Sequence, residues 1–316
     1  MKVLWDENAL PAMIGNIARS QNGEPIADIR PVGKGGFGSV YEVLSQSGTV
    51  QIWKAYQVTD TMLAEAQALR ELRKASPLPI PEVYHVHTAD EQYPVDLIAM
   101  EKISGRNAAG VRLPWSKNKR ERFRDILIDS VGAMHRYPCG TRYGLIGDSK
   151  KFDSWKAFYQ DFYLYVVEHA KDFCANADSQ SRKIYYLLQK GLDNLDFILS
   201  EPVSKPSLVH GDIWLPNVMV DPKTFTPTGI IDPLHAMWGD NEYDLFPLSA
   251  PVKTSLKLYQ TYKSRFQTSE KVDLKVALYA LVSEVRCNIR SQNRTGKMYY
   301  SFLIRRLEKQ FKRYGI

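Results

Sequence analysis

Two carboxylates and an amide lie in the middle of the chain, in an order that could carry out phosphoryl transfer. Asp212 and Asn217 belong to the segment 208–217, and Asp232 follows within Ile231-Asp232-Pro233. Transfer of a phosphoryl group to a hydroxyl needs one group that orients the acceptor and receives its proton, and oxygen ligands that hold magnesium on the nucleotide. We therefore predict that Asp212 is the catalytic residue and that Asn217 and Asp232 bind Mg²⁺.

A glycine-rich segment far upstream could bring backbone amides close to phosphate oxygens. It runs from residue 33 to 40 with the glycine spacing of the loop that protein kinases fold over ATP, and its predicted nucleotide-binding members are Gly33, Gly35, Gly36, Phe37, Gly38 and Val40. A glycine cluster after a strand is more often a plain turn when it stands alone. Here Lys54 and Glu65 follow in kinase order. We predict that Lys54 neutralises the α and β phosphates of ATP and that Glu65 holds Lys54 in place.

Hydrophobic periodicity predicts the elements that position these residues. In the first third of the chain it predicts helices over about 7–20 and 60–74, and strands over 26–32, 39–44, 49–56, 82–87 and 96–102. Beyond residue 105 the patterns are mostly helical, with segments at about 118–136, 153–173, 179–199, 254–266, 269–291 and 297–313. The short apolar runs 218–220 and 229–231 predict a β-hairpin that holds Asn217 and Asp232 at adjacent ends.

These elements predict an α+β, bilobal, protein-kinase-like fold. We expect an N-terminal nucleotide-binding lobe over residues 1–103, with an N-terminal helix and a small five-stranded antiparallel sheet carrying one main helix. A mainly helical catalytic and substrate lobe would occupy residues 104–316. The hinge between them would contact the nucleotide through Met100, Glu101 and Ile103, and the choice between ATP and GTP would depend on its backbone groups.

Composition places few limits on function. With 316 residues, of which 44% are hydrophobic and 24% charged, the chain has the profile of a globular protein of two lobes. Its net charge of +7 suits an anionic ligand, and ATP meets that need without nucleic acid. Cys139, Cys174 and Cys287 show no metal or disulfide spacing, and no run of 18 apolar residues occurs. We expect a cytoplasmic monomer or weak dimer with no nucleic-acid or membrane partner.

The motifs together resemble the small-molecule kinases of the aminoglycoside phosphotransferase and choline kinase superfamily. The resemblance runs from about residue 24 to 266 and rests on His210-Gly211-Asp212 with Asn217, on Ile231-Asp232, and on Gly239-Asp240-Asn241-Glu242-Tyr243-Asp244-Leu245. Trp214, the pair Asp232-Pro233 and the segment 153–159 are most similar to the fructosamine and ketosamine kinase branch. This resemblance implies ATP bound between a five-stranded lobe and a helical lobe. It also implies a structural role for Asp244 beneath the catalytic loop, while His210 is expected to pack there too.

The acceptor predicted in this way is a small molecule. Only seven residues separate Asp232 from Asp240, too few for the activation segment with which protein kinases bind peptides. Trp214, Trp238, Asp240 and Glu242 could offer aromatic faces and carboxylates to an amine-bearing sugar. Trp238 could equally fill core space.

The sequence is compatible with several acceptors and with more than one function. The leading one is a ketosamine such as a fructosamine or ribulosamine, free or on a glycated amine; an aminoglycoside or a choline-like alcohol is the alternative. A nucleotide-binding pseudokinase scaffold is the alternative from another class. Such proteins usually lose a residue equivalent to Lys54, Asp212 or Asp232, and here all three are present.

Overall fold

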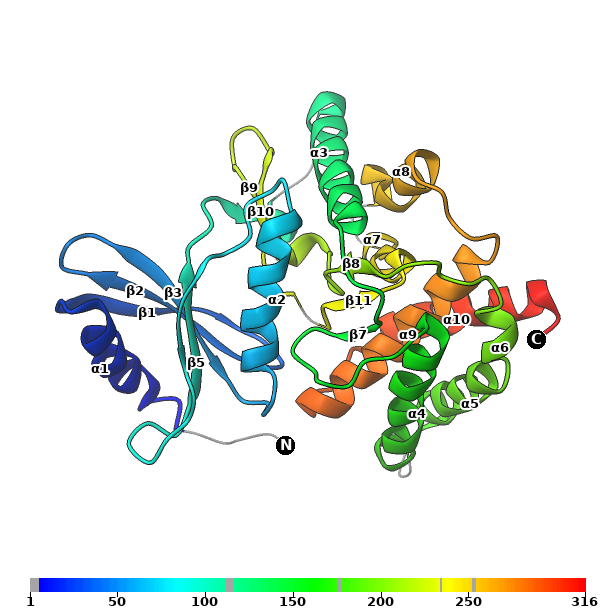
Figure 1. Cartoon of the computed structure of the whole chain (residues 1–316), viewed down its shortest axis with the longest axis horizontal. Coiled ribbons are helices and arrows are strands. Elements are labelled where there is room, and N and C mark those ends of the chain that lie inside the picture. The colour runs from blue at the N-terminus through cyan, green and yellow to red at the C-terminus, as the bar shows by residue number, and fades with distance from the viewer. Residues whose placement is uncertain (1–5, 112–115, 175–177, 234, 252–253) are drawn as a thin grey trace.

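The computed structural model describes residues 6–111, 116–174, 178–233, 235–251 and 254–316. Within these ranges an antiparallel sheet with two helices precedes a mainly helical region (Figure 1). The fold is therefore α+β and kinase-like, as the sequence predicted. No helix in the described ranges is long and apolar enough to cross a membrane.

The amino-terminal sheet has five strands in the order β1-β2-β3-β5-β4, all antiparallel to their neighbours. Its strands are β1 (Ile26–Lys34), β2 (Gly38–Ser45), β3 (Val50–Tyr56), β4 (Val83–His87) and β5 (Asp96–Glu101). The two helices of this region are α1 (Leu10–Asn22) and α2 (Met62–Ala75). All seven elements were predicted from the sequence, within a few residues at each end.

The two helices cover opposite faces of this sheet, because side chains alternate between the faces of a strand. In β5, Leu97 and Ala99 pack in the cluster that includes the apolar face of α1. Ile98 and Met100 instead pack in the cluster that includes α2 and continues into the helical region. Figure 1 shows α2 on the side of the sheet that faces the C-terminal helices. The helix that carries Glu65 is thus fixed between the two parts of the molecule.

The rest of the chain is mainly helical. Its α-helices are α3 (Lys117–Arg136), α4 (Trp155–Cys174), α5 (Ser179–Asp193), α6 (Leu195–Ile198), α7 (Leu245–Leu248), α8 (Leu258–Arg265), α9 (Val272–Ser291) and α10 (Lys297–Tyr314), and its 3₁₀ turns are η1 (Ala108–Gly110), η2 (Leu215–Asn217), η3 (Asn241–Asp244) and η4 (Thr254–Leu256). Helices α4, α5, α9 and α10 share one buried core. The division between lobes at residues 103 and 104 stays a prediction.

Two predicted helices are interrupted in the structure. The segment predicted as one helix over 179–199 is divided at Asn194, whose side-chain amide donates to the carbonyl of Lys190 at 2.8 Å. The segment 254–266 consists of η4 and α8, which are separated at Lys257 by a left-handed backbone conformation with φ 53°. Asn194, with φ −106° and ψ 13°, and Lys257 both have backbone angles outside the α-helical region, and such a residue interrupts a helix whatever the hydrophobic pattern around it.

Two three-stranded sheets lie in the helical region. One contains β6 (Arg106–Asn107), β9 (Val218–Val220) and β10 (Pro227–Ile230), and the other contains β7 (Gly144–Leu145), β8 (Ser207–Val209) and β11 (Met237–Gly239). The pairing of β9 with β10 confirms the predicted hairpin. The sequence did not predict β6, β7, β8 or β11, which have only two or three residues each and, unlike β9 and β10, are not joined to a partner strand by a short turn.

Candidate active site

Lys54 joins the two parts of the candidate site. Its ammonium nitrogen lies 2.9 and 2.7 Å from the two carboxylate oxygens of Glu65 and 2.5 Å from Oδ1 of Asp232. Lys54 comes from the central strand β3, Glu65 from α2, and Asp232 from the loop after β10. The structure thus brings together three residues that the sequence predicted would meet, although Lys54 and Asp232 are 178 positions apart.

The charges of this triad support one another. Burial alone would lower the pKa of Lys54, but the carboxylates of Asp232 and Glu65 outweigh burial and raise it above its usual value. The partial loss of hydration within the protein would raise the pKa of Asp232, and the nearby ammonium of Lys54 holds it below its usual value instead. The side chain of Asp232 is 48% exposed, whereas those of Lys54 and Glu65 are buried. Lys54 therefore stays cationic and Asp232 anionic at neutral pH, with one face of Asp232 open to a ligand.

Asp212 and Asn217 form the second half of the site. The Asn217 amide nitrogen donates to Oδ2 of Asp212 at 2.8 Å and to its backbone carbonyl at 3.0 Å. The hairpin places Asp232 nearby, because the N–H of Ile231 donates to the carbonyl of Asn217 at 2.9 Å. Asp232 itself has φ 60°, a left-handed conformation that costs free energy for a residue with a side chain and that often occurs at functional sites.

The loop that carries Asp212 is fixed from below by Asp244. This fully buried carboxylate accepts hydrogen bonds from the N–H of Gly211 at 2.7 Å and from the N–H of His210 at 3.0 Å, and it lies 3.0 Å from Nε2 of His135. His210 is also fully buried, and its Nδ1 accepts from the N–H of Asp212 at 3.2 Å. Burial lowers the pKa of His210, so the imidazole is neutral and can act as this acceptor. Both residues lie beneath the catalytic loop, but His210, which was expected to donate a structural hydrogen bond, accepts one from this loop through Nδ1.

The glycine-rich segment forms the turn between β1 and β2. The N–H of Gly35 donates to the carbonyl of Gly38 at 2.9 Å, and Gly33 pairs with Val40 across the two strands. A Cβ on Gly38 would overlap the carbonyl oxygen of Ala55, so only glycine fits there. A Cβ on Gly35 would meet no atom within 4 Å, so this glycine leaves open space over the turn.

The tip of the turn contacts α9. A Cβ on Gly36 would lie 3.2 Å from the Cβ of Ser291, and the guanidinium of Arg290 lies 5.9 Å from the ring centre of Phe37. Because α9 belongs to the helical region, this contact closes one side of the space between the two parts of the molecule. Of the predicted loop residues, Gly33, Gly35 and Val40 remain available to a nucleotide on geometric grounds, while Gly36 and Phe37 also pack on α9.

The predicted hinge residues lie at the end of β5. Met100 and Ile103 are buried, and the Glu101 carboxylate accepts from Arg73 at 3.0 Å and from the N–H of Glu82 at 3.2 Å. Their side chains therefore belong to the protein's own packing. Any contact of this segment with a nucleotide base would have to use its backbone groups.

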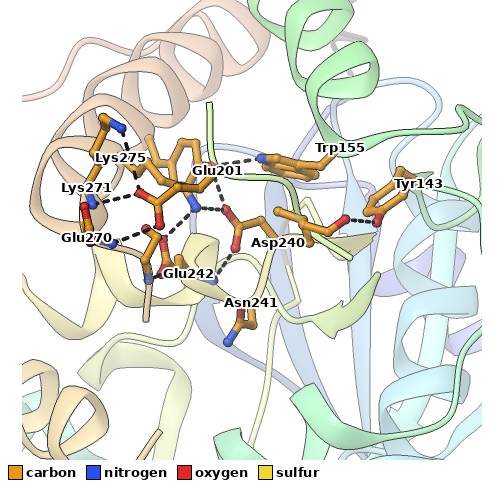
Figure 2. Close-up of polar contacts among 12 residues, drawn as sticks. Tyr143, Trp155, Glu201, Asp240, Asn241, Glu242, Glu270, Lys271 and Lys275 are labelled. Carbon is orange, nitrogen blue, oxygen red and sulfur yellow. Dashed lines mark hydrogen bonds and ion pairs between the residues drawn. The ribbon is translucent and has the colours of Figure 1, made fainter. Parts of the chain in front are cut away.

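Asp240 and Glu242 do not face an open site. Figure 2 shows both carboxylates directed at Lys275 of α9, whose ammonium lies 2.5 Å from Asp240 and 2.7 Å from Glu242. Tyr279 donates to Asp240 at 2.9 Å, and the hydroxyl of Ser269 donates to Glu242 at 2.7 Å. Asp240, Glu242 and Lys275 are each no more than 3% exposed. The predicted contact of Asp240 and Glu242 with the acceptor is therefore wrong. The two carboxylates have a structural role: they fix α9 to the η3 turn.

Of the two tryptophans in the predicted acceptor site, one is packed in the core and the other is exposed. Trp238 lies in β11, opposite Leu208 of β8, and is packed against the core. Trp214 is 41% exposed two residues after Asp212. It lines a mostly apolar cavity of about 250 Å³ together with Leu215, Pro247 and Leu258. Of the four residues predicted to contact the acceptor, Trp214 alone combines proximity to Asp212 in sequence with an exposed aromatic face.

Glu284 is a candidate that the sequence did not reveal. Burial raises the pKa of Asp212 well above its usual value, and the negative charges of Asp232, Glu284 and Asp244 raise it further. Glu284 projects from α9, half-buried, and its carboxylate accepts from the Asn288 amide at 3.1 Å. A lone glutamate within a long helix carries no motif, so only the tertiary structure could place this charge close to Asp212.

The residues present fit a divalent cation bound to a nucleotide. Nδ2 of Asn217 is directed at Asp212, which leaves the amide oxygen for a ligand, and Asp232 uses Oδ1 toward Lys54. One amide oxygen and one carboxylate oxygen are hard ligands of the kind that Mg²⁺ accepts when phosphates and water complete its coordination.

The comparisons with known proteins agree with this geometry. The chain matches the model of the phosphotransferase enzyme family over residues 28–271. Two similar structures carry the name "putative fructosamine-3-kinase". The one from Thermobifida fusca is 23% identical, with a TM-score of 0.68 over 95% of this chain and 98% of that chain, and the one from Haemophilus somnus is 20% identical, with a TM-score of 0.69 over 94% and 96%.

A third similar structure is a thermostable mutant of the aminoglycoside phosphotransferase APH(4)-Ia in ternary complex with ADP and hygromycin B. It is 16% identical, with a TM-score of 0.70 over 95% of this chain and 98% of that chain. A comparison with curated proteins found no match. At these identities the three structures confirm the fold, while the family match extends over most of the chain.

Proposed function

Because the chain belongs to the phosphotransferase enzyme family, we propose that it is a kinase that transfers the γ-phosphoryl group of ATP to a hydroxyl of a small, amine-bearing sugar, most specifically a ketosamine. The observation that carries this proposal is the convergence of Glu65, Lys54 and Asp232 beside the hydrogen-bonded pair Asp212 and Asn217. Residues 1–103 would bind the nucleotide, and residues 104–316 would supply the catalytic loop and the acceptor site.

Each residue has a defined task in this reaction. Lys54, held by Glu65, neutralises phosphate charge, and the open turn at Gly35 lets backbone amides approach the phosphates. Asp212 orients the acceptor hydroxyl and receives its proton as the bond to phosphorus forms. The hydrogen bond from Asn217 fixes the rotamer of Asp212, so the proton acceptor is positioned before the substrate arrives.

Magnesium is the cation proposed for Asn217 and Asp232; when bound, it would neutralise charge that develops on the transferred phosphoryl group. The complex of the aminoglycoside phosphotransferase with ADP supports an adenine nucleotide as the donor class. In the present structure Lys54 pairs directly with Asp232. Lys54 would hold phosphate oxygens and Asp232 would hold the cation when a nucleotide is bound.

Two features favour an acceptor that carries both an amine and hydroxyls. Trp214 offers an exposed aromatic face on which a sugar ring can stack. Burial and the neighbouring carboxylates raise the pKa of Asp212, so an acceptor ammonium group beside it would favour its ionised form. The two structures that carry the name "putative fructosamine-3-kinase" support a ketosamine, free or on a glycated amine. An aminoglycoside or a choline-like alcohol is the second candidate, because the same cationic preference and the hygromycin complex support it.

An acceptor panel tests this proposal. The purified protein is mixed with Mg·ATP and with a fructosamine, a ribulosamine, a panel of aminoglycosides or choline, and ADP release is followed by a coupled assay. We expect turnover with a ketosamine and none in the matched Asp212→Asn variant. Turnover of an aminoglycoside alone would replace the acceptor class. Failure of every acceptor, combined with normal Mg·ATP binding, would favour the scaffold reading.

A further inference from the structure

A second cavity lies between α2 and the helical region. Its volume is about 360 Å³, and its walls include Thr61 and Glu65 on the α2 side, His235 after the catalytic hairpin, and Arg286 and Arg290 on α9. Asp212, Asn217, Trp214 and the glycine turn are not among the described residues that line it. The cavity is therefore adjacent to the candidate active site through Glu65 and is built mainly from different residues.

Two polar groups in its wall are buried without a partner. Arg286 is 8% exposed, and its Nη1 has no hydrogen-bond partner in the described part of the chain. His235 is 7% exposed, and neither of its ring nitrogens has a hydrogen-bond partner there. A buried donor left without an acceptor costs free energy. The face of the Arg286 guanidinium packs 4.7 Å from the ring centre of Phe162, which fixes its plane.

The positive charge of this wall is poorly compensated. Burial and then the positive charge of Arg290 lower the pKa of Arg286 to about 10. Burial, followed by the charges of Arg286 and Arg290, lowers the pKa of His235 well below its usual value, so the ring is neutral. Two guanidinium groups one helical turn apart, beside a neutral imidazole, form a donor set that suits a tetrahedral oxyanion.

The carboxylates of the cavity leave room for such an anion. Glu65 is occupied by Lys54, and Asp60 and Asp148 are both exposed. Exposed carboxylates are screened by water and salt, whereas the arginine side is buried. A ligand with a phosphate at the arginine end and hydroxyls or an ammonium group toward Asp60 and Asp148 would match this distribution of charge.

The second arginine connects the cavity to the catalytic machinery. Nη2 of Arg290 donates to the hydroxyl of Thr61 at 3.0 Å, and Thr61 is the residue that precedes the first turn of α2. The same guanidinium lies near Phe37 at the tip of the glycine turn. Since α2 carries Glu65, an anion bound by Arg290 would act through this hydrogen bond on the element that holds Lys54.

We propose that this cavity is a binding site for a small phosphate-bearing anion, either inorganic phosphate or the monophosphate of a small sugar, separate from the nucleotide site. Arg286 and Arg290 would bind the phosphate oxygens and His235 would donate one further hydrogen bond. Bound anion would then stabilise the contact between α9 and α2.

Isothermal titration of the full chain with inorganic phosphate, and separately with a sugar monophosphate, tests the proposal against sodium chloride of equal ionic strength. We expect saturable binding in the millimolar range or tighter. Arg290→Met should weaken it by about tenfold or more, because one charge-assisted hydrogen-bonding group is lost. Arg286→Met should have a similar effect. Arg305→Met is the matched control: it removes one charge from an exposed position on α10 and should leave binding unchanged.

Repeating the titration with saturating Mg and a non-hydrolysable ATP analogue separates the two sites. We expect phosphate to bind with the nucleotide present. Competition between them, no saturable binding, or binding unaffected by Arg290→Met would overturn the proposal. If Arg286→Met fails to fold, as judged by circular dichroism, the half-buried Arg290 variant decides alone. The comparison of the two probes then identifies whether phosphate or a phosphorylated sugar is the better ligand.

Discussion

Replacing Asp244 should cost far more stability than its single charge suggests. Its two oxygens accept from the backbone of His210 and Gly211 and face His135, and the carboxylate has no exposed surface. Asp244→Ala leaves two buried N–H groups and a buried imidazole without an acceptor. Each buried group left without its hydrogen-bond partner typically costs about 1–3 kcal/mol, so the loss of three partners should cost about 3–5 kcal/mol or more. That is a large part of the roughly 5–15 kcal/mol by which native proteins are stable.

Asp221 offers a matched control for this variant. Its Oδ1 also accepts two backbone N–H groups, from Lys223 at 2.8 Å and Thr224 at 2.7 Å, but in an exposed turn. After Asp221→Ala these donors can bind water, so the free energy of unfolding should hardly change. Asp244→Asn keeps one acceptor oxygen and should fall in between, at about 1–3 kcal/mol.

Urea unfolding followed by circular dichroism measures all three variants, with the slope of the transition checked against the wild type. The reasoning is refuted if Asp244→Ala and Asp221→Ala change the free energy of unfolding by similar amounts. It is also refuted if Asp244→Ala stays fully active, because a loosened catalytic loop should lower kcat. A loss of activity without any loss of stability would contradict the stability argument and leave Asp244 only the role of positioning the catalytic loop.

Three further predictions test the candidate site. Asp212→Asn should lower kcat by about 10²- to 10⁴-fold and leave nucleotide affinity nearly unchanged, as single-turnover and binding measurements would show. Asp232→Ala should abolish the magnesium-dependent thermal stabilisation by ATP; stabilisation that persists, or that a chelator does not remove in the wild type, would contradict the metal assignment. Gly38→Ala should lower stability by about 1–3 kcal/mol because its Cβ overlaps Ala55, whereas Gly35→Ala should fold normally and weaken ATP binding. Equal stability of the two glycine variants in thermal unfolding would refute that distinction.

The sequence predicted the fold well where a pattern is local. Each strand of the amino-terminal sheet is long enough to show its alternation or its flanking turns, and α2 shows a helical period of apolar residues. The short strands β7, β8 and β11 could not be predicted in this way. They come together from three distant segments of the chain, and a strand of two or three residues is defined by its partners, not by its own composition.

The site was predictable to the extent that it follows motifs with fixed spacing. Asp212, Asn217 and Asp232 lie on one loop and one hairpin, so their proximity follows from local chain geometry. Lys54 and Glu65 were predicted only through their order in the chain, and the structure places both beside Asp232. No motif marks Glu284, Arg286 or Arg290. They lie on α9, far along the chain from the other site residues, so only the tertiary structure shows that they are close to the site.

The acceptor contact predicted for Asp240 and Glu242 was wrong because it rested on residue type alone. In sequence they are two acidic residues shortly after Asp232, as Asp244 is, and nothing local distinguishes an exposed carboxylate from a buried one. The distinction is made by Lys275, which is buried with them and forms an ion pair with each. A buried carboxylate without such a partner would take up a proton. The acceptor ammonium is therefore expected beside a carboxyl group whose ionised form the protein itself disfavours. Asp212 fits, because burial and neighbouring carboxylates raise its pKa and a bound ammonium group would favour its ionised form.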